Sequence, residues 1–280
     1  MVLVSINPTT TEEIKSYQEH SLDEIDNILS KAINAQKKWS LLELDFRLEC
    51  ISHISGILKD RKREYASIMA NEMGKPILQA IGEVEKCAWL CDYYREYAPE
   101  FLSDRLIKTE YHKSMVTFQP IGLILGIMPW NFPFWQVFRF AIPVLITGNG
   151  AILKHASNVQ GCAFAIESSF LEAGFPNDIF RNISISSKNV KDVIKNKAIS
   201  AVSITGSTPA GSSVAQTAGK YLKKTVLELG GNDPYIILDD ADLDNAIEAC
   251  ISGRILNTGQ SCISAKRLIV TKSLYHAFLK

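Results

Sequence analysis

The sequence lacks both a charge imbalance and a regular pattern of cysteines. Thirty Lys and Arg side chains balance thirty Asp and Glu side chains among 280 residues, so the formal net charge is +0. A neutral total gives no support for binding to nucleic acid or to an acidic membrane. The six cysteines are scattered without framework spacing, so we expect free thiols and a cytoplasmic location.

A secretory leader and a membrane span are also missing from the pattern. The opening residues, MVLVSINPTT, have no basic start followed by an apolar core, which predicts no secretory signal. The long apolar stretch at 122–147 contains three prolines and Arg139. An arginine near the centre of a spanning helix is costly, so we expect a buried strand followed by a buried helix.

Two familiar ligand patterns are absent as well. Cys87 and Cys91 lie four apart on an expected helix with no histidine nearby. Since a tetrahedral metal site needs two further ligands, we expect core cysteines and no metal. The glycines of GNGAIL do not form a GxGxxG fingerprint, because Leu153 occupies the place of the last glycine.

What is present is a change of periodicity near residue 105. Helical spacing predicts helices at 21–39, capped by Ser21, at 45–74, ending at Gly74, and at about 78–102. Beyond them, short apolar runs alternate with helical segments: strands at 114–120, 121–128, 151–154 and 201–205, and helices at 133–147, 160–173 and 209–222. This alternation predicts an α/β fold whose parallel sheet is covered on both faces and binds ligands at the carboxyl ends of its strands.

A second unit begins near residue 229. It has a strand, an acidic-capped helix, the turn that carries Cys262, and a last strand followed by the first turns of a helix. Because a unit of this size buries its own core poorly, we expect the chain to be incomplete.

Two segments of the α/β part suit nucleotide binding. Gly206 and Ser207 lie between an expected strand and a helix with Pro209 at its start, where free N–H groups attract an anion. An ordinary capped turn explains this segment equally well. Lys154 ends a strand, where it could meet a ribose hydroxyl or simply be solvated.

Three further side chains suit acyl chemistry, each with a plainer alternative. Asn131, between the prolines of PWNFP, could donate to a developing oxyanion or bond to the backbone. Glu228, before a glycine pair, could be a general base or a surface carboxylate. Cys262 could be a nucleophile or one more buried thiol.

In order and spacing, these segments together resemble the aldehyde dehydrogenase superfamily. The matching segments are PWNFP, GNGAILKHAS, SITGST, LELGGNDP and NTGQSC, and the resemblance runs from INPTT through EMGKPI to the last residues. It implies a Rossmann-like NAD(P)-binding domain at 1–105 and 122–228 and a bridging, oligomerisation hairpin at 106–121. Residues 229–280 would begin a catalytic α/β domain that is incomplete here.

The resemblance also implies roles for single residues. Cys262 would be the nucleophile, the Asn131 amide and the Cys262 backbone N–H the oxyanion hole, and Glu228 the base that activates water. The residues implied in cofactor binding are Trp130, Lys154, Ser157, Gly206 and Ser207. No metal is implied.

The implied reaction oxidises an aldehyde to an acid through a thiohemiacetal and a thioester. The presence of Glu228 favours hydrolysis over transfer to coenzyme A. The segments EMGKPI, AWLCDYY, IMPWNFPFWQV and LKHASN are similar to bacterial succinate-semialdehyde dehydrogenases. Arg139 would then hold the substrate carboxylate, or else form a surface ion pair. Leu256 stands where some relatives carry a second carboxylate-binding arginine, which weakens this substrate assignment.

The cofactor and the assembly remain open at this level. Ser157 stands where many NAD-preferring relatives have a glutamate that repels a 2′-phosphate, so both NAD and NADP are expected cofactors. The expected partners are a small aldehyde and further copies of the chain in a homo-oligomer. The alternative is a non-catalytic fragment that folds and binds nucleotide without turnover.

Overall fold

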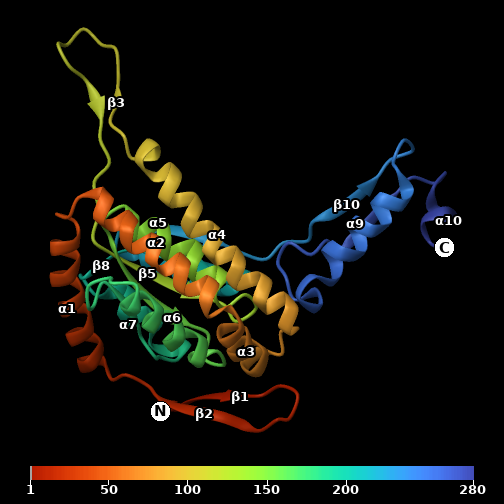
Figure 1. Ribbon diagram of the computed structural model, residues 1–280, viewed down its shortest axis with the longest axis horizontal. Coiled ribbons are helices and arrows are strands. Elements are labelled where there is room, and N and C mark those ends of the chain that lie inside the picture. Colours follow the sequence, from red (N-terminus) through yellow and green to blue (C-terminus); the bar gives the residue numbers. More distant parts are fainter. Residues whose placement is uncertain (1) are drawn as a thin grey trace. The chain divides into compact units, whose positions relative to one another are not determined.

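The computed structural model describes residues 2–280, and the chain divides into two compact units, Met1–Glu228 and Leu229–Lys280. The first unit is built on a five-stranded sheet in the order β7-β6-β5-β8-β9, with every neighbouring pair parallel (Figure 1). Its strands are β5 (Leu123–Met128), β6 (Gly150–His155), β7 (Phe180–Asn182), β8 (Ile199–Thr205) and β9 (Lys224–Glu228). The predicted α/β class with a parallel sheet is confirmed.

Helices cover both faces of this sheet. Ile124 and Leu153 point into one core and Leu125 and Ile152 into the other, because successive strand residues face opposite sides. One core is covered by α2 (Leu44–Asp60), α3 (Lys62–Met73), α4 (Ile77–Phe101), α5 (Trp135–Ile146) and α6 (Gln160–Glu172). The other is covered by α1 (Leu22–Trp39), α7 (Val190–Lys195) and α8 (Thr208–Lys220). A sheet buried on both faces explains why its strands read as continuous apolar runs.

The ends of the early helices follow local rules. Ser21 caps α1 in a capping box with Glu24, as predicted. Gly74 ends α3 with φ 72°, also as predicted. The single helix expected at 45–74 is wrong, because Arg61 leaves helical geometry (φ −102°, ψ 15°) between α2 and α3. A break of one residue changes the apolar periodicity so little that the sequence pattern does not reveal it.

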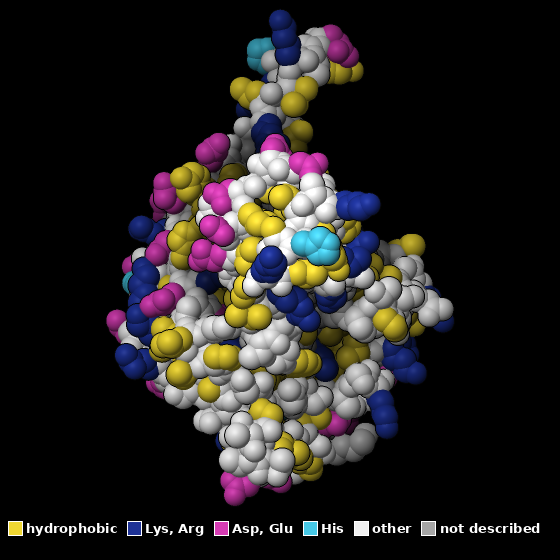
Figure 2. Space-filling model, turned by 90° about the vertical axis from the view of Figure 1, so that its right-hand side faces the viewer, with side chains coloured by type: hydrophobic (Ala, Val, Ile, Leu, Met, Phe, Trp, Pro, Cys, Tyr) yellow, Lys and Arg dark blue, Asp and Glu magenta, His cyan; other side chains and the backbone are white. Residues whose placement is uncertain are grey.

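Several strands escape the sequence pattern, and one is shorter than predicted. β1 (Val2–Ile6) and β2 (Glu13–Gln18) form an antiparallel hairpin, and β7 and β9 extend the sheet. Instead of a strand over 114–120, only β4 (Met115–Val116) pairs, with β3 (Arg105–Leu106). This short hairpin projects from the first unit and shows hydrophobic side chains at its surface among charged ones (Figure 2).

The second unit is small and has little core. β10 (Pro234–Ile237) pairs in parallel with β11 (Arg267–Val270), and α9 (Leu243–Ile255) begins at Asp242, which caps it. A turn at Leu256–Gly259 leads to Cys262, and α10 (Tyr275–Phe278) follows β11. The first unit contains a 3-10 turn, Ser187–Asn189, before α7.

The apolar and thiol-rich segments of the first unit lie in its interior. Residues 122–147 form β5 and α5, and Cys87 and Cys91 are fully buried on α4. Across residues 2–280, no helix combines the length and the hydropathy that crossing a membrane requires. Within the same residues, no three His, Cys, Asp or Glu side chains gather as metal ligands would.

Candidate active site

The carboxyl ends of four neighbouring strands carry most of the candidate residues of the first unit. β5 ends at Met128 and leads into the turn at 129–134, while β6 ends at Lys154 and His155. β8 ends at Thr205, directly before Gly206 and Ser207, and β9 ends at Glu228. Because parallel strands end at the same edge, the sheet brings these segments together, at the edge where open α/β sheets bind ligands.

His155 holds the turn that contains Asn131 from the side of the sheet. Its Nδ1 lies 2.9 Å from the Ala156 backbone nitrogen and 3.3 Å from the Met128 carbonyl oxygen, and its Nε2 lies 3.0 Å from the Pro133 carbonyl oxygen. In the tautomer with the proton on Nε2, Nδ1 accepts from the Ala156 N–H and Nε2 donates to the Pro133 carbonyl. Burial lowers the pKa of His155 to about 4, and the ring is therefore neutral near pH 7.

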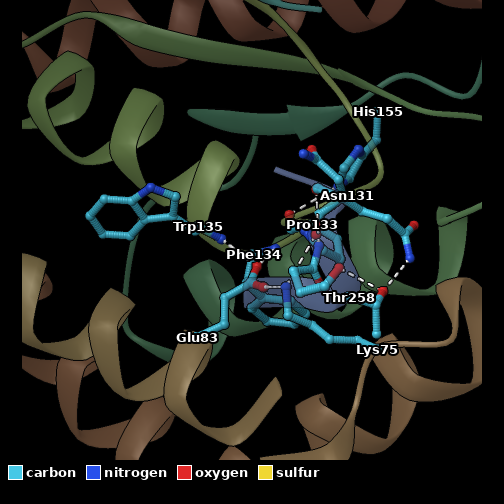
Figure 3. Close-up of polar contacts among 10 residues, drawn as sticks. Lys75, Glu83, Asn131, Pro133, Phe134, Trp135, His155 and Thr258 are labelled. Atoms are coloured by element: carbon cyan, nitrogen blue, oxygen red, sulfur yellow. Dashed lines mark hydrogen bonds and ion pairs between the residues drawn. The ribbon is translucent and has the colours of Figure 1, made fainter. Parts of the chain in front are cut away.

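Glu83 and Lys75 hold the same turn from the helical side (Figure 3). Glu83 Oε1 accepts hydrogen bonds from the backbone N–H groups of Phe134 and Trp135, both at 2.9 Å. Lys75 Nζ lies 2.5 Å from Glu83 Oε2 and donates to the Asn131 carbonyl at 3.1 Å. Both charged side chains are almost fully buried, at 1% and 2% exposure.

Neither residue was identified as functional from the sequence. Lys75 stands in the EMGKPI segment and Glu83 on the helix that follows, but only the fold shows that both reach the Asn131 turn. Burial lowers the pKa of Lys75 and raises that of Glu83, and the opposite charge of each partner counteracts both shifts.

A cavity of about 350 Å³ opens beside Lys154. Burial lowers the pKa of Lys154, and Glu19 partly counteracts this shift. The cavity is lined by three lysines and by small or apolar side chains: Ile127, Lys154, Ser187, Lys188, Val190, Lys191, Ile194, Ile204, Ala210, Ser213, Val214 and Thr217. Lysines and hydroxyl side chains on a partly apolar wall suit a ligand that combines a flat apolar body with phosphate groups.

The start of α8 adds a second feature for anion binding at this edge. Ser207 is the N-cap, its Oγ accepts from the Ala210 N–H at 3.4 Å, and Pro209 lies in the first turn. The N-terminus of a 13-residue helix carries partial positive charge. Four of the predicted cofactor residues, Trp130, Ser157, Gly206 and Ser207, are not among the residues that line the cavity.

Arg139 and Glu228 meet at the ends of β8 and β9. Arg139 Nη1 lies 3.7 Å from Glu228 Oε2, and Nη2 donates to Gln136 Oε1 at 2.9 Å and to Thr205 Oγ1 at 3.4 Å. About half of the Glu228 side chain is exposed. Of the two roles considered for Arg139, the ion pair is therefore present, and the role in substrate binding stays a prediction.

Cys262 lies in the second unit, on a turn with unusual backbone geometry. Asn257, Thr258 and Gly259 all have positive φ, at 53°, 54° and 77°. Two hydrogen bonds join the ends of the turn. Asn257 Nδ2 donates to the Gln260 carbonyl at 3.2 Å, and the Gln260 N–H donates to the Asn257 carbonyl at 3.0 Å. Cys262 is exposed, whereas the other five cysteines are buried.

The first unit is a Rossmann-like α/β sheet with a lysine-lined cavity, and the second unit carries an exposed thiol. The model of the aldehyde dehydrogenase family matches residues 2–280, and the chain belongs to the aldehyde dehydrogenase family.

Relatives with curated names show which members of the family are similar. A Synechocystis sp. protein named as a probable succinate-semialdehyde dehydrogenase of NADP(+) is 45% identical over the whole chain and 62% of its own length. The succinate semialdehyde dehydrogenase Sad of Escherichia coli, named for NAD(P)+, is 43% identical over 98% of the chain and 60% of its own length.

A solved structure agrees with this similarity. The structure of the succinic semialdehyde dehydrogenase of Streptococcus pyogenes in complex with NADP+ matches with a TM-score of 0.96 and 39% sequence identity. The match covers 99% of the present chain and 61% of the Streptococcus pyogenes chain. The chain thus spans about 60% of the length of these relatives.

Proposed function

We propose that the chain carries the cofactor site, the nucleophile and the base of an NADP-using dehydrogenase that oxidises succinic semialdehyde to succinate. The observation that supports this most is the presence of Asn131, the Lys154 cavity and Glu228 at one edge of the parallel sheet. The named relatives, two of which are succinate-semialdehyde dehydrogenases of NADP(+) or NAD(P)+, supply the substrate class.

The residues of the first unit fit a phosphorylated dinucleotide. Lys154, Lys188 and Lys191 line the cavity and would hold the ribose and its 2′-phosphate, which favours NADP over NAD. The start of α8, at Ser207, would face the pyrophosphate. Trp130, Ser157 and Gly206 stay predicted cofactor contacts. When bound, the oxidised nicotinamide supplies the acceptor for the hydride that leaves the aldehyde carbon.

The chemistry of the chain's own residues follows from their types. The Cys262 thiolate forms a bond to the carbonyl carbon, and the Asn131 amide donates to the oxygen that becomes negative. After oxidation to the thioester, the Glu228 carboxylate takes a proton from water, whose oxygen attacks the acyl carbon. The carbon–sulfur bond then breaks and releases the acid. The Arg139 guanidinium would bind the second carboxylate of the substrate.

Absorbance of the reduced cofactor tests this proposal. The 280-residue chain is mixed with succinic semialdehyde and NADP+, and in parallel with NAD+. We expect turnover that Cys262→Ala abolishes and that Cys250→Ala, a change to a buried cysteine of the same unit, preserves. Equal turnover by the Cys262→Ala variant would contradict the assignment of the nucleophile.

Nucleotide binding without turnover is the second candidate function. It is supported by the location of the lysine-lined cavity within the first unit, which also holds the two large cores. Binding of NADP+ with no turnover by the wild-type chain would favour this candidate. Association into a homo-oligomer stays a prediction, supported by exposed apolar side chains on the β3–β4 hairpin such as Leu106 and Val116.

A further inference from the structure

Two buried glutamates perform the same local task on two different helices. Glu72, on α3, accepts from the backbone N–H groups of Gly161 and Cys162 at the start of α6, at 2.8 and 2.9 Å. Glu83 does the same for Phe134 and Trp135 at the start of α5. Neither α5 nor α6 has a hydrogen-bonded side-chain cap of its own. Each glutamate therefore satisfies helix N–H groups that would otherwise be buried without an acceptor.

The two caps differ in what else they hold. Glu72 also accepts from Ser5 Oγ, on the β1–β2 hairpin, at 2.5 Å. The Cβ that an alanine would add at Gly161 would lie 2.9 Å from the Glu72 carboxylate, so α6 is fitted closely to this cap. Glu72 thus joins α6 to the N-terminal hairpin, and none of these bonds reaches the Asn131 turn.

Glu83 instead joins α5 to the turn through Lys75. Lys75 Nζ is bound to Glu83, donates to the Asn131 carbonyl, and lies 3.8 Å from the centroid of the Phe132 ring. The pair therefore forms hydrogen bonds to both ends of the turn: Lys75 to the Asn131 carbonyl, and Glu83 to the N–H groups that follow Pro133 (Figure 3).

A buried ion pair contributes little net stability to a fold, because its charges must first be removed from water. Removing two charges from water costs about as much as their attraction returns, and apolar residues of similar volume often stabilise a fold as well or better. The geometry of the bonds, which all converge on the backbone around Asn131, offers another reason for the pair.

We infer that Lys75 and Glu83 are positioning residues, which fix the backbone of the 131–135 turn and thereby aim the side-chain amide of Asn131. The inference rests on the proposed function for the role of that amide as the oxyanion donor. The orientation itself is independent of any turnover and can be measured alone.

The test compares Glu83→Gln and Lys75→Met with Glu72→Gln, the matched cap that does not hold the turn. The readout is the side-chain amide resonances of Asn131 in ¹⁵N–¹H spectra, assigned by their loss in Asn131→Ala. We expect Glu83→Gln and Lys75→Met to shift these resonances, whereas Glu72→Gln leaves them unchanged. In turnover, kcat should fall by roughly 10- to 100-fold in the first two variants, with KM for NADP+ changed by less than about twofold.

The apolar double variant Lys75→Met/Glu83→Leu separates positioning from stability. It leaves no unpaired buried charge, although the Phe134 and Trp135 N–H groups lose their acceptor, so it should lose less stability than the single variants, and far-UV circular dichroism establishes that it is folded. We expect it to shift the Asn131 resonances although the fold is retained. Unchanged resonances in this variant, or shifts equal to those in Glu72→Gln, would overturn the inference. Absence of turnover in the wild-type chain would count against the proposed function alone.

Discussion

The two units position their candidate residues in different ways. In the first unit, residues far apart in the sequence meet in a buried interior: Glu83 bonds to Phe134 across 51 positions. In the second, the turn before Cys262 bonds to itself across three positions, from Asn257 to Gln260. Among the described residues of the second unit, three apolar side chains are buried, Ile237, Cys250 and Ala265. Long-range bonds therefore hold the Asn131 turn, and bonds across three positions contribute to the shape of the Cys262 turn.

The largest contrast should appear in the core. Phe170 is fully buried, and its ring lies 4.3 Å from that of Phe180 and 5.5 Å from that of Phe138. We expect Phe170→Ala to lower the free energy of unfolding by about 3–5 kcal/mol. Ile251→Ala, at an exposed position on α9, should cost less than ~0.5 kcal/mol.

Urea unfolding followed by tryptophan fluorescence measures this difference. All four tryptophans lie in the first unit, so fluorescence reports that unit, and hydrogen exchange of the α9 amides reports the second unit in the same urea series. Similar shifts of the midpoint in both variants would contradict the contrast between the units.

Acid should destabilise the first unit through His155. Its pKa falls from 6.5 to about 4 on folding, so below pH 6.5 the unfolded chain binds a proton that the folded chain does not. The contribution of the neutral His155 side chain to the free energy of unfolding is thus fully present above pH 6.5. As the pH falls toward 4, this contribution of about 3 kcal/mol is lost.

Urea midpoints at pH 7.5, 6 and 5, in steps chosen across that window, check this dependence. We expect the pH dependence to weaken in His155→Gln. The control is His276→Gln, at an exposed histidine of the second unit, which should keep the wild-type slope. A His155→Gln variant with the wild-type slope would show that another group causes the acid sensitivity.

A glycine substitution should loosen the Cys262 turn without affecting the first unit. Gly259 has φ 77°, and an added Cβ would lie 3.3 Å from the Arg254 carbonyl. Gly259→Ala should cost about 1 kcal/mol and raise trypsin cleavage in the second unit about fivefold. Gly230→Ala, where nothing lies within 4 Å of the added Cβ, is the control. Equal cleavage of the two variants would mean that the positive φ does not shape this turn.

The smallest effect should separate the two cofactors. Lys188→Ala removes one cationic side chain from the cavity wall, and the affinity for NADP+ should fall about fivefold, or ~1 kcal/mol, because the contact is partly solvated. NAD+, which lacks the 2′-phosphate, should bind almost as before. Lys195→Ala, on α7 but outside the cavity lining, is the matched control in calorimetric titrations. An equal loss of affinity for NADP+ and NAD+ would show that Lys188 does not contact the 2′-phosphate.

The same contrast explains what the sequence could predict. Local signals, such as the Ser21 cap, the end of α3 at Gly74 and the apolar run of β5, were sufficient for most helices and the central strands. β9 was missed because every residue of this edge strand is exposed, so its pattern carries no buried face. Lys75 and Glu83 were missed because their burial and pairing arise only when α4 packs beside the turn that begins α5.

Trapping the acyl intermediate tests the central claim most directly. The Glu228→Gln variant, incubated with NADP+ and succinic semialdehyde, is digested and its peptides are weighed by mass spectrometry. Because the proposed base is missing, the account predicts one succinyl group on the peptide that contains Cys262 and none when NADP+ is omitted. A variant that binds NADP+ but carries no acyl group on Cys262, or carries it on another residue, would contradict the account.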